Sequence, residues 1–363
     1  MDEMQPHRKG LTIMRRILLV FLLAAGVMYV ILHCTIWRTN SYWISLREIF
    51  KKSEEKFYRM LPPTDSARKE QVIDCTSKSS ISTSIKIEKS YPFLCCHNFL
   101  QVSQLHESHN LELPYGIKKA ERYFQMALSK LNNCGLFAED DGSSSCKKCV
   151  VVGNGGVLRN RSLGETIDSY DVIIRMNNGP VLGYEEDVGR RTTFRLFYPE
   201  SVFSDPIHYD PNTTAVLVVF KPHDLKWLWD LLSGQHVIKT YAFWKKPAMQ
   251  MIYKANQIRI LDPAITRRTA YDLLHLPTKF SQKERPKHPT TGLIAITFAF
   301  NVCSEVHLAG FKYNLENQNS SLHYYGNETM SLMTQNAYHD IAAEQKFLKE
   351  LTDNGIVINL SEE

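Results

Sequence analysis

The stretch Cys149-Val-Val-Val-Gly-Asn-Gly-Gly-Val157 decides how this chain folds. Its first four residues are all apolar, which is typical of a strand buried on both faces of a sheet. The glycines that follow predict a tight turn in which backbone N–H groups approach an anion closely. The stretch therefore predicts an α/β protein that holds a nucleotide in a short loop, with Asn154 and Asn177 offering amides to its sugar or phosphate.

Further strands are predicted at 170–176, 193–197, 215–220 and 306–310. An amphipathic helix is predicted over 115–131, because apolar residues recur there on one side, and a loop over 137–148. Apolar strands that alternate with helical stretches predict a single Rossmann-like, mostly parallel sheet flanked by helices on both faces.

A dinucleotide-binding fingerprint is the rival interpretation of the glycines. Gly153 and Gly155 have its spacing, but Leu158 occupies the position of its third glycine. The acidic residue that binds a ribose should end the second strand, whereas Asp171 begins it. The sequence therefore disfavours a nucleotide-cofactor oxidoreductase.

A second motif, Pro289-Thr-Thr-Gly-Leu-Ile-Ala295, opens a stretch that stays apolar as far as Cys303. Thr290 and Thr291 predict the N-cap region of a helix that Gly292 enters. A helix that is apolar nearly all round is buried, so most of it is core. Only its N-terminus, where N–H groups and the positive end of the dipole meet, is suited to face a phosphate.

Two histidines lie in short motifs near the C-terminus, Leu322-His-Tyr-Tyr325 and His339-Asp-Ile-Ala-Ala-Glu344. The second motif opens an amphipathic helix with Ile341, Leu348 and Leu351 on one face. A histidine at the start of a helix is placed to point into a cleft. Spacing alone still favours a structural histidine over a catalytic one.

The N-terminal part predicts a membrane anchor. Residues 17–36 carry no charge, and 20 helical residues span roughly 30 Å, the thickness of a bilayer core. Arg15 and Arg16 precede the span, and Trp37 follows it as an interfacial aromatic. The expected organisation is a cytoplasmic tail (1–16), a transmembrane signal anchor (17–37), a luminal stem (38–90) and a catalytic domain (91–363).

Charge, cysteines and glycosylation sequons agree with a protein of the secretory lumen. The formal charge is +5 over 363 residues and no stripe of Lys or Arg stands out, which argues against a nucleic-acid partner. Seven cysteines follow the span, an odd number, so at least one is unpaired or intermolecular. N-glycosylation sequons begin at Asn160, Asn212, Asn319, Asn327 and Asn359.

Residues 149–193, 289–311, 323–325 and 339–344 together resemble, in order, the four sialylmotifs of the animal sialyltransferases, glycosyltransferase family 29. The segments 175–180, 197–201 and 243–247 resemble the β-galactoside α-2,3 subgroup. This resemblance implies a GT-A-like variant of the α/β fold in the Golgi membrane. It also implies transfer of N-acetylneuraminic acid from CMP-Neu5Ac to the 3-hydroxyl of terminal galactose, preferably Galβ1-4GlcNAc on glycoproteins and glycolipids.

The resemblance also implies roles for individual residues. The donor would be bound by Asn154, Gly155, Asn177, Thr290, Thr291 and Gly292. Cys149 would pair with Cys303, closing a loop of about 150 residues and contributing about 2–5 kcal/mol to stability. Cys146 is expected to pair with Cys95 or Cys96, while Cys75 and Cys134 stay unassigned.

The implied mechanism is an inverting single displacement. His339 would act as the general base, His323 would hydrogen-bond the departing phosphate, and Glu344 and Tyr324 would support the site. CMP carries a single phosphate, and Glu139-Asp-Asp141 and Glu185-Glu-Asp187 look like solvated loop residues, so no metal or other cofactor is expected.

Three alternatives stay open. One is a sialyltransferase with another acceptor, such as a type 1 chain, a core 1 chain or lactosylceramide. Another is the oxidoreductase, and the third is a membrane lectin that keeps the fold. The lectin predicts loss of His339 or His323, and both are present.

Overall fold

The computed structural model describes residues 28, 91–96, 99, 110–131, 147–237, 240–278, 286–312, 316–335 and 337–362. The chain divides into two compact units, residues 1–70 and 71–363, and every element below belongs to the second. Within the described residues no helix has the length and apolar character needed to cross a membrane. The predicted anchor, apart from Met28, the predicted stem and most of the predicted loop at 137–148 lie outside them.

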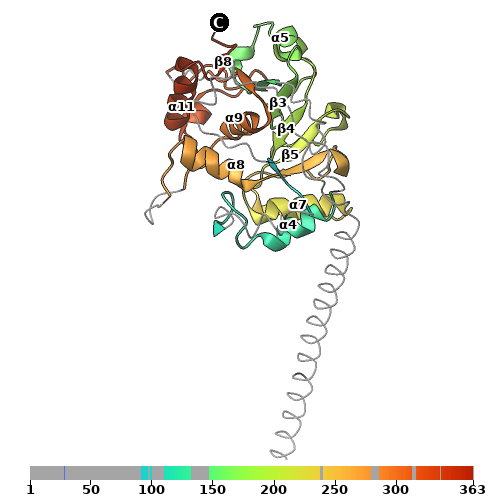
Figure 1. Ribbon diagram of the computed structural model, residues 1–363. Coiled ribbons are helices and arrows are strands. Elements are labelled where there is room, and N and C mark those ends of the chain that lie inside the picture. Colours follow the sequence, from blue (N-terminus) through green and yellow to red (C-terminus); the bar gives the residue numbers. More distant parts are fainter. Residues whose placement is uncertain are drawn as a thin grey trace, which may run out of the picture. The chain divides into compact units, whose positions relative to one another are not determined.

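The described strands form one sheet in the order β1-β6-β5-β4-β3-β2-β7-β8 (Figure 1). Their bounds are β1 Phe93–Leu94, β2 Lys148–Val152, β3 Val172–Met176, β4 Phe194–Phe197, β5 Thr214–Leu217, β6 Ile258–Leu261, β7 Glu305–Ala309 and β8 Ile358–Asn359. All neighbouring strands pair in parallel except β1 and β6. The predicted mostly parallel sheet and all five predicted strands are confirmed. The edge strands β1 and β8 have two residues each, too short to leave a pattern in the sequence.

The described α-helices are α4 Glu121–Leu128, α5 Gly164–Asp168, α6 Glu185–Val188, α7 Pro222–Leu232, α8 Pro263–Arg267, α9 Thr291–Val302, α10 Ser331–Thr334 and α11 Ile341–Asp353. Short 3-10 turns lie at Gly156–Leu158, Pro206–His208, Thr240–Ala242 and Ala255–Gln257, and a π-helical turn at Arg268–Leu273 continues α8.

Two of these helices differ from the prediction. The helix expected over 115–131 is confined to α4, because Lys119 has a φ of 65°, which an α-helix does not allow. In α11 the buried face is made by Phe347, Leu348 and Leu351, whereas Ile341 at its start is only half-buried.

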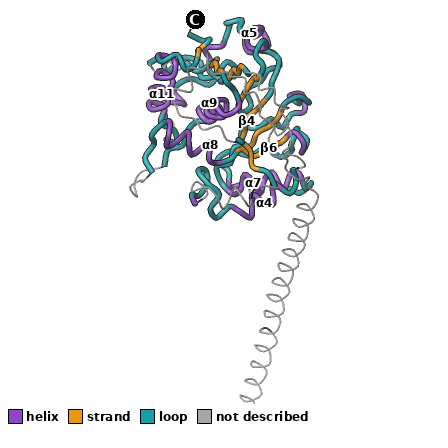
Figure 2. The backbone as a smooth tube through the Cα atoms, viewed as in Figure 1, coloured by secondary structure: helices purple, strands orange, loops and turns teal. Residues whose placement is uncertain are grey.

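Helices cover both faces of the sheet, as predicted. On one face α9 packs between the strands and α11 (Figure 2), and every residue of α9 except Val302 is buried. On the other face α4 and α7 lie side by side over β4, β5 and β6, with Trp227 fully buried among them (Figure 1). The sheet is therefore covered on both faces, so a ligand can approach it only at the ends of its strands.

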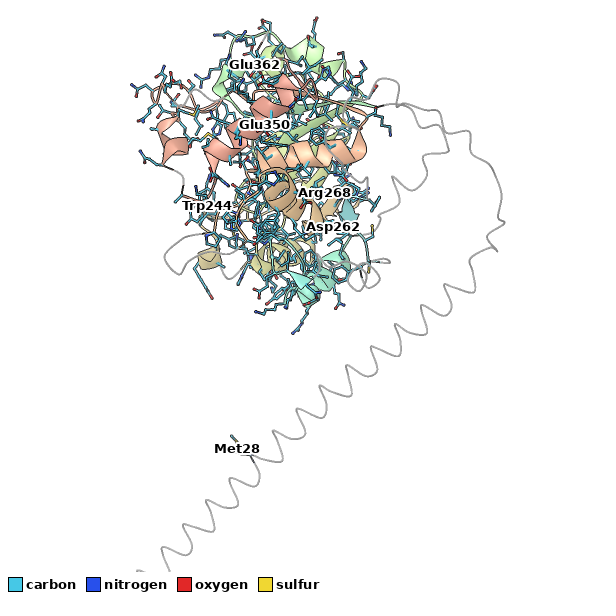
Figure 3. The ribbon with its side chains drawn as sticks, turned by 60° about the vertical axis from the view of Figure 1, so that its left-hand side comes forward. Met28, Trp244, Asp262, Arg268, Glu350 and Glu362 are labelled. Carbon is cyan, nitrogen blue, oxygen red and sulfur yellow. A yellow bond between two sulfur atoms is a disulfide. The ribbon has the colours of Figure 1, made fainter. Side chains whose placement is uncertain are left out.

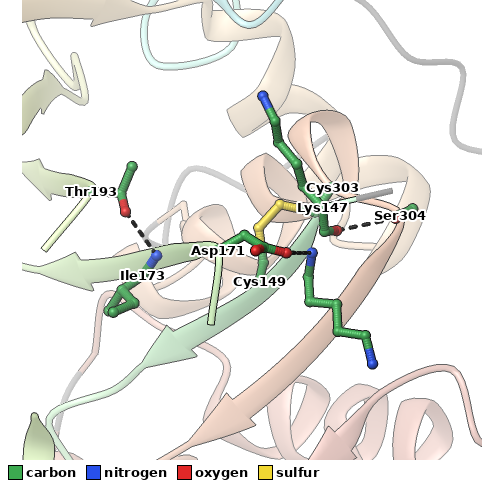
Figure 4. Close-up of a disulfide and its surroundings, with 8 residues drawn as sticks. Lys147, Cys149, Asp171, Ile173, Thr193, Cys303 and Ser304 are labelled. Carbon is green, nitrogen blue, oxygen red and sulfur yellow. Dashed lines mark hydrogen bonds between the residues drawn. A yellow bond between two sulfur atoms is a disulfide. The ribbon is translucent and has the colours of Figure 1, made fainter. Parts of the chain in front are cut away.

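The predicted disulfide between Cys149 and Cys303 is confirmed (Figure 4). It joins the start of β2 to the end of α9 across 154 positions, with a Cα–Cα distance of 6.0 Å. Asp171 accepts a hydrogen bond from the backbone N–H of Lys148 beside it, at 2.9 Å. Cys95 is also disulfide-bonded, to a partner outside the described residues, whereas Cys96 is a free, exposed thiol. Cys96 is therefore excluded as a partner of Cys146, and the Cys95–Cys146 pair stays a prediction.

Candidate functional site

The predicted site residues gather at the carboxyl edge of the parallel strands, starting with the glycine loop after β2. The N–H of Gly153 donates to Ala309 at 2.7 Å, and that of Gly155 donates to Gly310 at 3.2 Å. A Cβ at Gly155 would lie 2.4 Å from the Gly310 carbonyl oxygen. These glycines are therefore required for close backbone packing onto the loop after β7, and the N–H groups of Gly153 and Gly155 are engaged within the protein. The position of the third fingerprint glycine is filled by the fully buried side chain of Leu158, which packs against Gly310.

The two asparagines that were predicted to bind the donor follow adjacent strands. Asn154 lies after β2, and its Nδ2 donates to the hydroxyl of Tyr325 at 3.4 Å. Asn177 follows β3 with a φ of 55°, in the left-handed region that non-glycine residues seldom adopt. Its side-chain Oδ1 is buried and has no hydrogen-bond partner among the residues that the structure describes. A buried carbonyl without a donor is costly, so a ligand hydroxyl or amine would stabilise it.

Arg195 is a site residue that the sequence analysis missed. It comes from β4, is 4 % exposed, and its Nη1 donates to the carbonyls of Asn177 at 2.9 Å and Gly179 at 3.0 Å. Tyr324 holds the same turn, because its hydroxyl donates to the Pro180 carbonyl at 2.7 Å. Burial raises the pKa of Tyr324 to about 12, so this donor keeps its proton. The signal for Arg195 was a single charge within the buried pattern Phe194-Arg-Leu-Phe197.

The N-terminus of α9 is capped as predicted, and Glu344 is part of the cap. The side chain of Thr290 accepts from the N–H of Leu293 at 3.4 Å. The N–H and the hydroxyl of Thr290 each donate to Glu344, both at 2.7 Å. Glu344 is 1 % exposed, and burial raises the pKa of its carboxyl to about 7 although Thr290 lowers it. Thr290 and Glu344 thus join two segments 54 positions apart at one helix end.

Thr291 and Gly292 complete this helix end. Thr291 is buried, and Gly292 lies against the ring of Phe311 and the sulfur of Met176. Met176 ends β3 and Phe311 follows β7. The start of α9 therefore lies over the same strand ends as the loops of Asn177 and Gly310.

His339 lies directly before α11, and its ring is held by the segment that precedes α9. Its Nδ1 lies 2.7 Å from the carbonyl oxygen of His288. A carbonyl only accepts, so Nδ1 carries the proton, and Nε2 of the neutral ring has its lone pair available. Burial lowers the pKa of His339, which keeps the ring neutral, although the bond to His288 opposes this. This is the protonation state that a general base requires.

His323 lies beside the glycine loop. It forms an isolated antiparallel bridge with Gly155, and its ring stacks on Tyr325 with centroids 5.0 Å apart. Its Nδ1 faces the carboxylate of Glu328 at 3.2 Å, which leaves Nε2 to face a ligand. Burial lowers the pKa of His323, and Glu328 opposes that effect.

The glycosylation and acidic motifs lie elsewhere. Asn359 is buried in β8, and its Oδ1 accepts from the N–H of Ser361, so a glycan does not fit there in the folded domain. The other four predicted acceptors, Asn160, Asn212, Asn319 and Asn327, are exposed.

The acidic run at 185–187 was predicted to be a solvated loop. That prediction is wrong, because these residues form the start of α6. Asp187 there accepts from the backbone N–H groups of Asn160, Arg161 and Ser162.

Comparison with known proteins gives the class that this fold and site define. Residues 93–356 match the family glycosyltransferase family 29 (sialyltransferase). This chain belongs to that family, as the four motifs predicted.

Individual relatives share most of the chain. The human type 2 lactosamine alpha-2,3-sialyltransferase is 55% identical over 350 residues, which cover 96% of this chain and 100% of the relative. The enzyme of that name from Mus musculus is also 55% identical, over 348 residues. The CMP-N-acetylneuraminate-beta-galactosamide-alpha-2,3-sialyltransferase 4 of Pan troglodytes is 42% identical over 252 residues, covering 69% of this chain and 75% of the relative.

Among solved structures, the crystal structure of a mammalian sialyltransferase has the same fold. Its TM-score is 0.56 at 23% sequence identity, with 75% of this chain and 90% of that chain covered.

Proposed function

We propose that this enzyme transfers N-acetylneuraminic acid from CMP-Neu5Ac to the 3-hydroxyl of a terminal galactose, with Galβ1-4GlcNAc as the preferred acceptor on glycoproteins and glycolipids. The observation that carries the proposal is the 55% identity, over 96% of the chain, to relatives named for this acceptor and linkage. The chemistry of the site agrees with it, because a half-buried histidine with a lowered pKa and two asparagine-bearing loops lie near the same strand ends.

His339 is the proposed general base. Nε2 removes the proton from the galactose 3-hydroxyl while the hydroxyl oxygen attacks the anomeric carbon of the sialic acid. The bond from that carbon to the CMP phosphate oxygen breaks in the same step, so the anomeric configuration inverts and CMP leaves with the bonding electrons. Positioned proton transfer of this kind contributes about 10²–10⁴-fold to a rate.

The other polar groups would hold the donor. Asn154 and Asn177 are placed to meet its sugar or base, and the buried Oδ1 of Asn177 needs a donor such as a ribose hydroxyl. The α9 N-terminus at Thr291 and Gly292 favours the phosphate electrostatically. His323 would donate from Nε2 to the departing phosphate, which requires its protonated form. Burial disfavours that form, whereas Glu328, 3.2 Å from Nδ1, and the negative phosphate itself would favour it.

We also propose that the catalytic domain is a GT-A-like variant that works in the Golgi lumen, held by the anchor at 17–37 and the stem at 38–90. CMP carries one phosphate, so we expect full activity without a metal. The enzyme should keep its activity in excess EDTA, and loss of activity that Mn²⁺ restores would contradict this.

The test uses the full-length enzyme in detergent with CMP-Neu5Ac and a panel of acceptors. These are Galβ1-4GlcNAc, a type 1 disaccharide, a core 1 disaccharide and lactosylceramide. The matched variants are His339→Ala and His236→Ala, the latter an exposed histidine outside the site. We expect a product from Galβ1-4GlcNAc that an α2,3-specific sialidase cleaves, about 10²–10⁴-fold slower formation by His339→Ala, and unchanged rates for His236→Ala.

Each other outcome has a definite meaning. A higher kcat/KM for another acceptor would keep the family chemistry and overturn the acceptor. Wild-type activity in His339→Ala would overturn the base. If the wild-type enzyme binds CMP but transfers to no galactoside, the proposed function is wrong.

A further inference from the structure

One loop exposes large aromatic side chains without a partner in the described fold. We refer to residues 240–250 as the aromatic loop. Tyr241 is 81 % exposed and Trp244 is 72 % exposed, while Phe243 and Pro247 between and beside them are buried. Figure 3 shows Trp244 at the outer edge of the domain. Exposed aromatic side chains that lie together on one loop indicate a binding surface, whereas apolar side chains scattered singly over a surface do not.

The aromatic loop is firmly anchored to the carboxyl edge of the sheet. The N–H of Ala248 donates to the carbonyl of Pro199, just beyond β4, at 3.0 Å. The indole of Trp227 in α7 donates to the Ala248 carbonyl at 2.7 Å. Phe243 packs into the core beneath the ammonium group of Lys221, which lies 4.7 Å from its ring centre. The exposed rings therefore stand on a fixed base, which lowers the entropy that binding would cost.

A buried charge cluster reinforces this anchor. Nζ of Lys221 lies 2.9 Å from the carboxylate of Glu200 and 3.0 Å from that of Asp224, and both acidic side chains are fully buried. Burying such a cluster costs desolvation free energy, so it is weak evidence for added stability, and what it contributes here is the connection between its residues. The cluster connects the segment after β4, which contains Glu200, to the ring of Phe243.

The aromatic loop and the catalytic site share the same edge of the sheet. The aromatic loop contacts the segments that follow β4 and β5. In the sheet, β5 lies two strands from β3, and Asn177 follows β3. Two strand spacings are roughly 10 Å, so the base of the aromatic loop and the turn of Asn177 lie at neighbouring strand ends. Tyr198 directly follows β4. Its phenol is close enough to Tyr325 that ionisation of Tyr198 would raise the pKa of Tyr325, although burial is the larger cause of the raised value.

We infer that Trp244 and Tyr241 form an extension subsite for the acceptor glycan, in which their rings stack on the apolar faces of the sugars that follow the terminal galactose. The inference rests on the proposed function. An aromatic face suits a pyranose because one face of the sugar ring presents only C–H groups. A neutral oligosaccharide is the favoured occupant because the loop adjoins the catalytic edge. Lys245 and Lys246 beside Trp244 make an anionic membrane surface the competing occupant.

The test compares how full-length variants in detergent depend on acceptor length. The acceptors are methyl β-galactoside, Galβ1-4GlcNAc and a tetrasaccharide that ends in the same disaccharide. For Trp244→Ala we expect kcat/KM for the two longer acceptors to fall about 2- to 10-fold more than for the monosaccharide. The fall should lie in the acceptor KM, with the KM for CMP-Neu5Ac unchanged. Ile358→Ala, which trims an exposed apolar residue on β8, is the control and should match the wild type throughout.

The other results overturn the inference. Equal losses on all three acceptors, or a raised KM for the donor, would mean that Trp244 supports the fold. Unchanged kinetics together with weaker binding of Trp244→Ala to vesicles containing anionic lipid would assign the loop to the membrane surface. Both results require a wild-type enzyme that sialylates galactosides. A wild-type enzyme without that activity would refute the proposed function instead.

Discussion

Replacing Glu344 by Gln should change how the stability of the enzyme depends on pH. Glu344 is 1 % exposed and accepts two hydrogen bonds from Thr290, at 2.7 Å each. Burial raises the pKa of its carboxyl from an ordinary 4.5 to about 7. Gln has nearly the same shape and no titrating proton. Its oxygen keeps the bond from the Thr290 N–H, and its amide donates to the Thr290 hydroxyl.

The magnitude follows from this pKa difference. Between about pH 4.5 and 7 the folded state holds a proton on Glu344 that the unfolded chain has released, so raising the pH favours unfolding. A pKa difference of about 2.5, at about 1.4 kcal/mol per pKa unit, corresponds to about 3.5 kcal/mol. The wild type should lose this stability relative to Glu344→Gln as the pH rises through the window. Above pH 7 the difference stays constant.

The assay is thermal unfolding of the full-length wild type and Glu344→Gln at intervals from pH 4.5 to 8. Their Tm difference should shift in favour of the variant by roughly 7–14 °C, at about 2–4 °C per kcal/mol. Other titrating groups are common to both proteins and cancel in the difference. Glu344→Ala, which removes both contacts with Thr290, should have a lower Tm than Glu344→Gln at every pH. Parallel Tm curves for wild type and Glu344→Gln would refute the reasoning, because Glu344 would then ionise as it does in water.

Three further predictions concern other parts of the domain. Arg195→Met should raise the KM for CMP-Neu5Ac about 10-fold or more, since it leaves the carbonyls of Asn177 and Gly179 without a charged donor, and Arg195→Lys should restore part of the loss. If the KM of Arg195→Met for CMP-Neu5Ac equals that of the wild type, the turn that contains Asn177 and Gly179 is held without Arg195. Cys303→Ser should cost about 2–5 kcal/mol of stability and remove any effect of a reductant on this bridge, as thermal unfolding with and without dithiothreitol would measure. Asn359→Gln should leave the glycoform pattern on a gel unchanged, and a band shift there would show that β8 is open when the glycan is added.

The sequence by itself determined the class and the centre of the fold. The four apolar residues at 149–152 predict a buried strand. The uninterrupted apolar run after Thr290 predicts a buried helix. Because these patterns are local, the five predicted strands and the N-cap at Thr290 agree with the structure. The family, which the four ordered motifs implied, agrees as well. The helix over 115–131 was predicted too long, because the positive φ of Lys119 leaves no trace in a pattern of apolar residues.

Only the tertiary structure decided how the site is held. Arg195 reaches across to the turn after β3, Glu344 caps a helix 54 positions earlier, and His288 fixes the tautomer of His339 from 51 positions away. Periodicity reports which face of an element is apolar, and it carries no information about which distant polar atoms meet. The protonation of Glu344 and of His339 depends on burial, which the whole fold creates. For that reason the sequence predicted the reaction class, whereas the charge state and the hydrogen-bond partners of each candidate site residue came only from the structure.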